Sequence, residues 1–407
     1  MQPLRIAVVG AGPVGLALSL LAARTLPSAQ VCLFDARARG ADVSGDARTL
    51  ALSLGSVQLL ERLRAWDAAH AQPILEVLVS QQPAVLAVPA WLGTPEVRLS
   101  AAALGVPMLG AVLSYGALVA PLQRAWDELV TAEPARLTSR FGTPVASLKD
   151  LTDGVEVDAG IAERFDFAVV AEGGVFGQQR LADVQSDYRQ DAWVGSVTLE
   201  RLAPGLAVER FTRHGPAALL PLPAGPDGRA RAALVWCVPR PIDKDSDPMR
   251  ELDPAQRLAV LNTVFDAHVG RIESVSALKC FPLGLAFHKS LVRARQVRIG
   301  NAAQTLHPVA GQGLNLGLRD AYALTAALHD ASPRGQVTSG LDAALARVAW
   351  QRAPDRWALI AATDFLARSF TWGAPGIDTL RGIGLTVLDR LPWAKRALAR
   401  QMMYGSR

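Results

Sequence analysis

The sequence has few of the residues that build disulfide frameworks or metal sites. Its 407 residues include three cysteines, and no two of them form a CxxC pair. A disulfide scaffold and a thiolate metal site are therefore not expected, and the cytoplasm is the expected compartment. The six histidines never fall at a metal-ligand spacing such as HxxxH, so no metal is expected.

Charged residues are also scarce, at 19% of the chain, whereas hydrophobic residues make up 50%. The net charge of +5 is too small to imply a nucleic-acid partner, but it favours an anionic cofactor or an anionic membrane surface. The sequence contains no internal repeat and no low-complexity tract. Its length suits two intertwined domains or one large α/β domain.

One apolar run, Ile6–Ala23, resembles a signal peptide or a marginal membrane span, since it is uncharged and follows an arginine. Gly10, Gly12 and Gly15 argue against both, because they divide the run into a strand, a tight turn and a helix. A second strand-like run, residues 31–34, follows. We therefore expect a βαβ unit here instead of a targeting segment.

The turn inside this unit is a GxGxxG motif at residues 10–15. Its first glycine, Gly10, allows the tight turn, Gly12 lets the backbone approach a pyrophosphate, and Gly15 lets the helix pack on the strand. Asp35 follows Gly15 by 20 residues, at the end of the second strand, where a carboxylate accepts hydrogen bonds from a ribose diol. These features together predict a dinucleotide site.

A second glycine-rich segment separates FAD from NAD as the ligand. Residues 299–303 and 307–317 form another turn before a helix, nearly 300 residues after the first. Such a turn presents a second positive helix end to an electron-rich group. In a flavoprotein that group is the edge of the isoalloxazine ring, which gains negative charge on reduction. The sequence therefore predicts FAD.

The hydrophobic pattern predicts an α/β fold, in which a Rossmann-type FAD-binding domain is interleaved with a β-rich substrate domain and followed by a C-terminal helical tail. Helices are expected at about 48–70, 118–131 and 253–270, from about 313, and throughout the tail from about 341. The expected FAD-binding domain comprises residues 1–73, 111–176 and 286–330, the substrate domain 74–110 and 177–285, and the helical region 331–407.

Several of these segments resemble a known family, the ubiquinone-biosynthesis hydroxylases, which are p-hydroxybenzoate-hydroxylase-like FAD-dependent monooxygenases. The likeness is strongest over residues 300–320, and it extends to residues 46–53, residues 215–221 and the tail. It implies that the first glycine turn and Asp35 bind the ADP half of FAD, and that Arg48 contacts the cofactor. It also implies that Gly300 and Asn301 lie along the ribityl-pyrophosphate, and that the turn from Pro308 to Asn315, with Gly311 and Gly313, borders the flavin ring. His307 sits in the same turn.

The chain also departs from the family pattern at two places. The usual Ala-Asp-Gly motif, followed by a serine, is Ala-Glu-Gly here at residues 171–173, with Phe176 at the serine position. The usual Asn/Gln-Arg pair before the helix near 118 is Tyr115-Gly116. Because these positions help to hold FAD or NAD(P)H in the family, we expect altered cofactor affinity or altered engagement of the reductant.

His307 and the C-terminal tail each allow two interpretations. His307 either contacts the flavin or the substrate phenol, or is a structural histidine before Pro308. The tail either lies on a membrane surface or a partner, or packs on its own domain with a solvated basic face. Its basic residues stand against the single acid Asp389 and alternate with leucines and a tryptophan: Arg381, Arg390, Lys395, Arg396, Arg400 and Arg407.

The resemblance implies hydroxylation of an aromatic ring by O2, with NAD(P)H as the reductant and a prenylated phenol as the substrate. The enzyme is expected in the cytoplasm, peripheral at the inner face of the membrane, as a homo-oligomer or within a biosynthetic complex. Two other interpretations stay open. One is a catalytically weak flavin-binding subunit of such a complex, and the other is an FAD oxidoreductase of prenyl lipids, such as a reductase.

Overall fold

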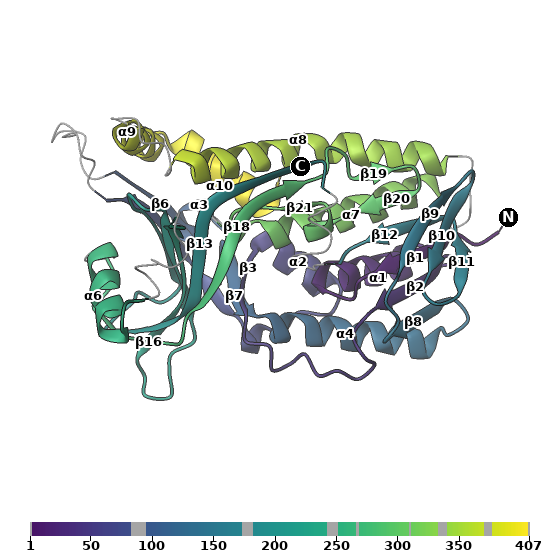
Figure 1. Cartoon of the computed structure of the whole chain (residues 1–407), viewed down its shortest axis with the longest axis horizontal. Helices are drawn as coiled ribbons and strands as arrows, with labels where there is room; N and C mark the ends of the chain where they lie inside the picture. The colour runs from purple at the N-terminus through teal and green to yellow at the C-terminus, as the bar shows by residue number, and fades with distance from the viewer. Residues whose placement is uncertain are drawn as a thin grey trace.

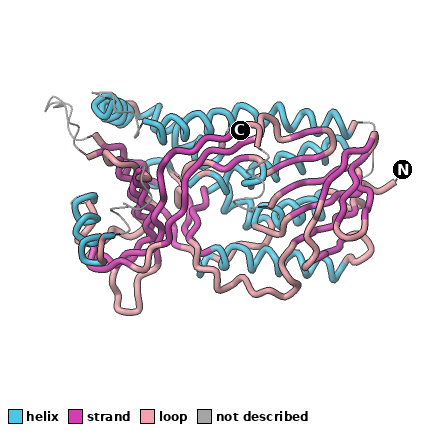
Figure 2. Tube along the Cα trace, viewed as in Figure 1, coloured by secondary structure: helices cyan, strands magenta, loops and turns pink. Residues whose placement is uncertain are grey.

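The computed structural model describes residues 2–82, 95–172, 182–241, 251–265, 268–308, 311–332, 340–369 and 377–405. Two sheets lie side by side along the longest axis, and a long helix crosses above both of them (Figure 1). Strands make up most of the left-hand part in this view, whereas helices and strands alternate in the right-hand part (Figure 2). The architecture is therefore mixed α/β, as the sequence predicts.

The right-hand part begins with the predicted βαβ unit. It consists of β1 (Arg5–Val9), α1 (Pro13–Thr25) and β2 (Gln30–Asp35). Strand β1 pairs in parallel with β2 and with β12 (Phe167–Val170). The sheet is completed by β8 (Leu137–Phe141), β20 (Gln296–Arg298) and β19 (Val292–Arg293), in the order β19-β20-β12-β1-β2-β8. Burial on both faces explains why β1 and β12 are continuous apolar runs.

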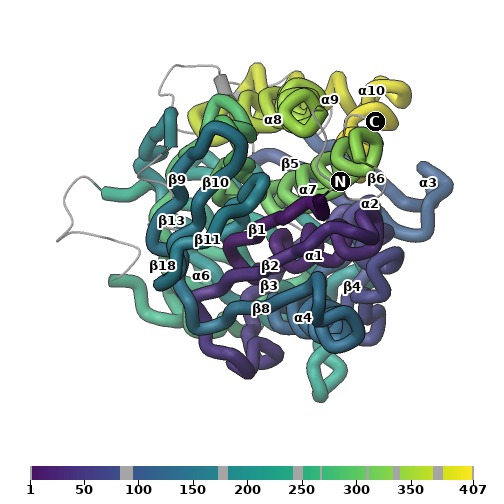
Figure 3. The backbone as a smooth tube through the Cα atoms, turned by 90° about the vertical axis from the view of Figure 1, so that its right-hand side faces the viewer, coloured from purple at the N-terminus to yellow at the C-terminus, as the bar shows by residue number. Residues whose placement is uncertain are grey.

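The two faces of this sheet are covered differently (Figure 3). Helices α1, α4 (Tyr115–Ala132) and α7 (Gly313–Ala331) share one core with apolar residues of the sheet. A small antiparallel sheet covers the other face and packs on Phe34 and Ala168. It is built from β9 (Ser147–Leu151), β10 (Gly154–Asp158) and β11 (Ala162–Phe165).

The prediction of one helix over residues 48–70 is wrong. Thr49–Ser53 is a strand, β3, which pairs antiparallel with β7 (Gly110–Ser114), and β7 also pairs with β4 (Gln72–Ile74). The helix, α2, covers only Leu54–Arg62, and a 3-10 turn, η1 (Ala68–His70), follows. Two leucines at alternate positions, Leu50 and Leu52, suit a strand as well as a helix, and pairing with β7 decides between them.

The large antiparallel sheet forms the left-hand part. Its order is β21-β18-β13-β16-β15-β14-β5-β6, and β17 pairs with β13. Helix α6 (Pro254–Val264) packs on it through Leu261 and Val264, and α3 (Ala101–Leu104) follows β6. The strands are β5 (Glu76–Gln81), β6 (Glu96–Ser100), β13 (Val184–Leu199), β14 (Leu206–Phe211), β15 (Pro216–Leu222), β16 (Ala230–Pro239), β17 (Ile272–Val275), β18 (Lys279–Phe287) and β21 (Gln304–Thr305).

The predicted helical tail is confirmed as α8 (Leu341–Ser369), α9 (Ile377–Arg390) and α10 (Pro392–Tyr404). Helix α8 packs along α7, α9 along β6, and α10 along α2. Buried Arg352 of α8 donates to Asp320 of α7 at 2.8 Å and to Asp355 at 2.7 Å. Among the residues described, no helix is long and apolar enough to cross a membrane.

The predicted domain limits stay a prediction. Strands of the parallel sheet come from residues 5–35, 137–170 and 292–298, and those of the large sheet come mainly from residues 76–100 and 184–287. One strand of the large sheet, β21 at residues 304–305, lies within a segment assigned to the FAD-binding domain.

Candidate flavin site

The two glycine-rich turns, far apart in the sequence, meet in the structure. A Cβ added to Gly317 of α7 would lie 2.7 Å from the Cα of Gly300 and 2.9 Å from a methyl of Val14 in α1. Gly300 itself has φ +60° and faces the same valine. A side chain on Gly317 would therefore not fit between the Gly300 backbone and the Val14 side chain. The fold therefore places both predicted cofactor segments at one site.

The three glycines of the first turn have different surroundings. Gly10 adopts φ +106°, and a Cβ there would meet the backbone of Ala171 and Glu172 at about 3 Å. A Cβ on Gly15 would overlap the carbonyl oxygen of Gly10, so packing of helix on strand requires this glycine. A Cβ on Gly12 would meet nothing closer than 3.9 Å. The fold itself leaves that space open.

Both helices that begin at the glycine turns lack a capping side chain. Gly12 is the N-cap of α1, Gln312 is the N-cap of α7, and neither helix has an acid in its first turn. The first N–H groups of a helix have no partner within it and carry the positive end of its dipole. A Cβ on Gly313 would likewise meet nothing within 4 Å. Two open, positive helix ends fit a cofactor with a pyrophosphate at one end and an electron-rich ring at the other.

Asp35 lies beside the first turn, as the sequence predicts. Its carboxylate accepts hydrogen bonds from the Ala11 amide at 2.6 Å, from the Arg37 amide at 2.8 Å and from Arg37 Nε at 2.9 Å. Arg37 also donates to the Ala11 carbonyl at 2.6 Å. Arg37 is thus a residue of this site that the motif, which ends at the acid, does not indicate.

Asn315 holds the second turn in place. Its Oδ1 accepts from the Ser53 amide and the Ser56 hydroxyl, both at 2.8 Å. Its Nδ2 donates to the carbonyls of Ala51 and Gly311, both at 3.2 Å. The amide therefore uses its full hydrogen-bonding capacity within the protein. Asn315 is therefore a positioning residue. Contact of its side chain with the cofactor stays a prediction.

His307 is buried and joins the flavin turn to the large sheet. Its Nε2 lies 3.0 Å from Oε1 of Gln190 in β13, and its ring meets the Tyr188 ring edge-on at 5.5 Å. Burial lowers the pKa of His307 to about 4, so the imidazole is neutral at pH 7. The sequence contains no signal that pairs it with Gln190, 117 residues away. Its catalytic role stays a prediction.

The remaining predicted residues lie around the second turn. Gly300 and Asn301 form a 3-10 turn, η4 (Gly300–Ala302), in which Asn301 is exposed. The amide of Gly311, at φ +59°, donates to the Pro308 carbonyl at 2.9 Å. A Cβ there would contact the Ala51 methyl at 3.6 Å. The turn is thus seated on β3, and the roles of these residues toward the cofactor stay predictions.

The chain is similar in sequence to known proteins over most of its length. The FAD binding domain family matches residues 170–350. Ubiquinone hydroxylase UbiL of Rhodospirillum rubrum is 30% identical over 366 residues, which cover 88% of this chain and 80% of that protein. The chain belongs to the ubiquinone hydroxylase family. The 3-demethoxyubiquinol 3-hydroxylase of Escherichia coli is 29% identical, with 97% of each chain covered.

Solved structures show the same fold as this ubiquinone hydroxylase family member. The p-nitrophenol 4-monooxygenase PnpA of Pseudomonas putida superposes with a TM-score of 0.71 at 16% identity, over 100% of both chains. Klebsiella pneumoniae HpxO, complexed with FAD and uric acid, superposes with a TM-score of 0.67 at 17% identity, over 97% of this chain and 96% of that one. The chain is therefore an FAD-dependent monooxygenase by family, and it shares the fold of these two proteins.

The Tyr115-Gly116 departure from the family pattern has a structural explanation. The Tyr115 amide donates to the Arg48 carbonyl at 2.6 Å, and the Gly116 amide donates to the Asp46 carbonyl at 3.0 Å. A Cβ at Gly116 would overlap the carbonyl oxygen of Ser44. A larger residue at position 116, including the family arginine, therefore does not fit beneath this segment.

Arg48, the predicted cofactor contact, is bound to neighbouring side chains. It reaches Asp46 at 2.7 Å and 3.0 Å and stacks on Tyr115, with its Cζ 4.2 Å from the ring centroid. The guanidinium holds the pKa of Asp46 below its usual range. The Arg48 guanidinium thus makes a cation–π contact with the Tyr115 ring. Contact of Arg48 with the cofactor stays a prediction.

The other departure from the family pattern, at residues 171–176, lies partly within the described residues. The backbone of Glu172 lies directly against Gly10, so this segment borders the first turn. Gly173 and Phe176 lie outside the described residues.

Proposed function

We propose that this enzyme hydroxylates the aromatic ring of a polyprenylated phenol in ubiquinone biosynthesis, with O2 and NAD(P)H as co-substrates. The observation that carries the proposal is the meeting of two uncapped, glycine-lined helix ends from opposite parts of the chain, in a member of the ubiquinone hydroxylase family. When bound, FAD supplies the redox chemistry by taking electrons from NAD(P)H and activating oxygen.

The chain's own residues hold and polarise the site. The first N–H groups of α7 stabilise negative charge at the second turn, because the helix dipole and the open hydrogen-bond donors act together. Neutral His307, held by Gln190, joins this turn to the sheet of the predicted substrate domain. We expect exclusion of water around the bound flavin to limit loss of the activated oxygen as hydrogen peroxide.

The reductant is proposed to bind without a nucleotide domain of its own. In the described part of the chain, one parallel sheet carries a βαβ unit that opens on GxGxxG, and the predicted FAD segments occupy it. The residues that differ from the family pattern, Tyr115 and Gly116, lie beside this unit, where they shape the approach of a second nucleotide.

We further propose that the last two helices rest on an anionic membrane surface, from which a prenylated phenol is reached. Leu380 and Val387 of α9 and Trp393 of α10 expose 69%, 47% and 71% of their surface. Arg396 and Arg400 are exposed on α10. A Trp/Leu face flanked by arginines suits the interfacial layer of a bilayer.

Two of the basic tail residues do not take part in this surface. Arg381 is half-buried and donates to Gln81 Oε1 at 2.9 Å, and Lys395 pairs with Asp389 at 2.8 Å. Ala399 and Met403 of α10 are buried in the protein core. Removal of the tail would therefore damage the fold, so surface substitutions are the appropriate test.

Deletion of the gene tests the proposed reaction in the cell. Mass spectrometry of the lipid extract should detect a prenylated ring that lacks one hydroxyl, and expression of the intact chain should remove it. An unchanged quinone pool in the deletion strain would contradict the proposal. Accumulation of a precursor with its ring fully hydroxylated but an altered prenyl chain would favour a prenyl-lipid reductase instead.

A further inference from the structure

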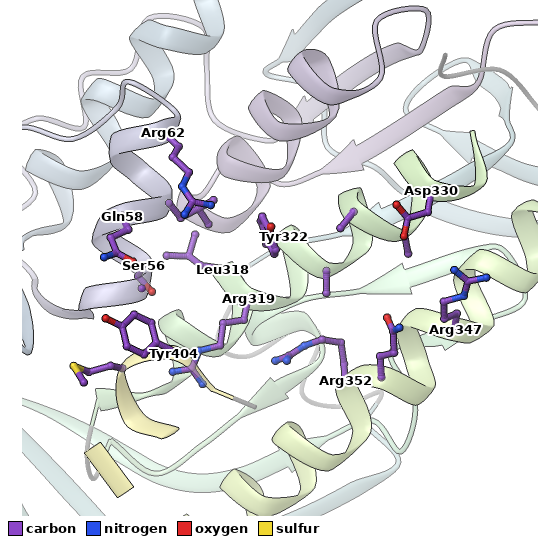
Figure 4. Close-up of a pocket in the computed structure, with 17 residues that line it drawn as sticks. Ser56, Gln58, Arg62, Leu318, Arg319, Tyr322, Asp330, Arg347, Arg352 and Tyr404 are labelled. Atoms are coloured by element: carbon purple, nitrogen blue, oxygen red, sulfur yellow. The ribbon is translucent and has the colours of Figure 1, made fainter. Parts of the chain in front are cut away.

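A groove separate from the flavin site lies between four helices. It has a volume of about 550 Å³, with walls from α2, α7, α8 and α10. Figure 4 shows Gln58 and Arg62 on one rim, Arg347 on the opposite rim, and Tyr322 on α7 between them. None of the predicted cofactor-binding residues lines it. The groove therefore does not belong to the predicted flavin site.

The floor of the groove is shaped to receive another helix. Helix α7 lines it from Leu318 to Asp330, which at about 1.5 Å per residue is a length of roughly 18 Å. Ala323, Ala326 and Ala327 lie on this stretch at helical spacing. These alanines leave room beside Tyr322, which stands on the same face of α7, so a second helix can lie along this stretch with Tyr322 as an anchor.

The rims carry positive charge that the protein leaves uncompensated. Arg62 and Arg347 are exposed, and neither side chain has a hydrogen bond or an ion pair within the described residues. By contrast, Arg319 and Arg352 on the inner wall are bound to Asp355 and Asp320. Asp330 is the one acid among the described lining residues. The occupant is therefore expected to be acidic on both flanks.

The composition favours a protein over a lipid. The lining contains arginine, tyrosine and methionine, and among the described residues it contains no lysine and no glutamate. Tyr322, which lines the groove, exposes 40% of its surface. Tryptophan, tyrosine and arginine dominate the binding energy of protein interfaces. A concave trench with an alanine floor suits the helix-in-groove mode of recognition.

We propose that this groove binds an acidic amphipathic helix of a partner protein. The small or apolar face of that helix would lie on the alanines of α7. Its Asp and Glu side chains would pair with Arg62 on one rim and Arg347 on the other. The proposal is independent of the substrate of the flavin site.

Photo-crosslinking in the native cell tests this proposal. A benzophenone amino acid is placed in the full chain at Gln58 or at Gln351, on opposite rims, and at exposed Glu128 of α4 as the control position. The crosslinked peptides are then sequenced by mass spectrometry. Both rim positions should capture the same acidic helical segment of one other protein, at a yield at least about tenfold above the control position.

Two variants establish that the groove itself is occupied. R62E/R347E reverses the rim charges, and Ala326→Trp fills the floor, so each should lower the crosslink yield at least about tenfold. Circular dichroism and unchanged FAD content show that both variants stay folded. Capture of lipid, of a second copy of this chain or of a non-acidic segment would overturn the proposal. Yields that equal the control, or that the variants leave unchanged, would also overturn it.

Discussion

Gly12 and Gly15 have different surroundings, in line with the different roles that the GxGxxG motif gives them. A Cβ on Gly15 would overlap the Gly10 carbonyl, whereas a Cβ on Gly12 would extend into open space at the start of α1. Gly12→Val should therefore abolish FAD binding while it changes the free energy of unfolding by less than about 1 kcal/mol. Flavin absorbance after dialysis with excess FAD measures FAD binding, and urea unfolding measures the free energy of unfolding.

Gly15→Ala is the matched control for this substitution. It adds a smaller side chain but should destabilise the protein by more than about 3 kcal/mol, since helix and strand must separate to admit it. A folded Gly12→Val protein that retains stoichiometric FAD would contradict the placement of the pyrophosphate at this glycine.

Burial of His307, which lowers the pKa of its imidazole, should make the stability of the protein depend on pH. Its pKa is about 4 in the folded protein and 6.5 for the ordinary side chain, so the unfolded chain takes up a proton first as the pH falls. Above pH 6.5 the group has no effect. Between pH 6.5 and 4 it should remove about 1.4 kcal/mol per pH unit, or roughly 3 kcal/mol in total.

The substitution His307→Gln removes the titrating group and keeps a donor toward Gln190. Urea unfolding from pH 7.5 to pH 4 should then show a shallower loss of stability than in the native chain. Identical slopes for the two proteins would show that His307 titrates normally and is not buried as described.

At the scale of elements, Asn315 joins α7 to β3 and α2. Asn315→Ala leaves the Ser53 amide and the Ser56 hydroxyl buried without their acceptor, and should cost about 2–4 kcal/mol in the free energy of unfolding. Exposed Asn301 is the matched control, because no such clamp depends on it. Asn301→Ala should weaken FAD binding with less than about 0.5 kcal/mol change in stability. The reverse pattern in the two variants would contradict both assignments.

The exposed face of α9 and α10 predicts salt-sensitive binding to anionic vesicles. R396Q/R400Q should lower co-sedimentation about tenfold or more, since each basic side chain near the surface contributes about 1 kcal/mol. Trp393→Ser should also lower it. Ile161→Ser, at a side chain of similar exposure far from the tail, should not. Equal sedimentation of all four proteins would remove the proposed membrane contact.

Elements were predictable where local patterns are unambiguous. The βαβ unit, the helix from Gly313 and the helical tail follow from glycine placement and apolar spacing, and the structure confirms them. The strand Thr49–Ser53 was not predictable, because its pairing partner, β7, lies about 60 residues later. The site divides in the same way: the glycines and Asp35 follow from a motif, whereas Arg37, Gln190 and Ser56 acquire their contacts through tertiary structure.

In the molecule as a whole, two glycine-rich segments about 300 residues apart in the sequence lie against each other. Residues near 12 and near 313 begin the two uncapped helices, and β13 of the large sheet reaches the second turn through Gln190. From this arrangement we expect both glycine segments to be needed for flavin binding.

Incubation of the FAD-loaded enzyme with a short-tailed prenylated phenol, NAD(P)H and oxygen-18 gas tests whether the enzyme inserts an atom of O2 into the aromatic ring. We expect substrate-stimulated oxidation of NAD(P)H, with one oxygen-18 atom in the new ring hydroxyl for each NAD(P)H consumed. Consumption of NAD(P)H with hydrogen peroxide as the sole oxygen product, or a hydroxylated ring whose new oxygen comes from water, would contradict it.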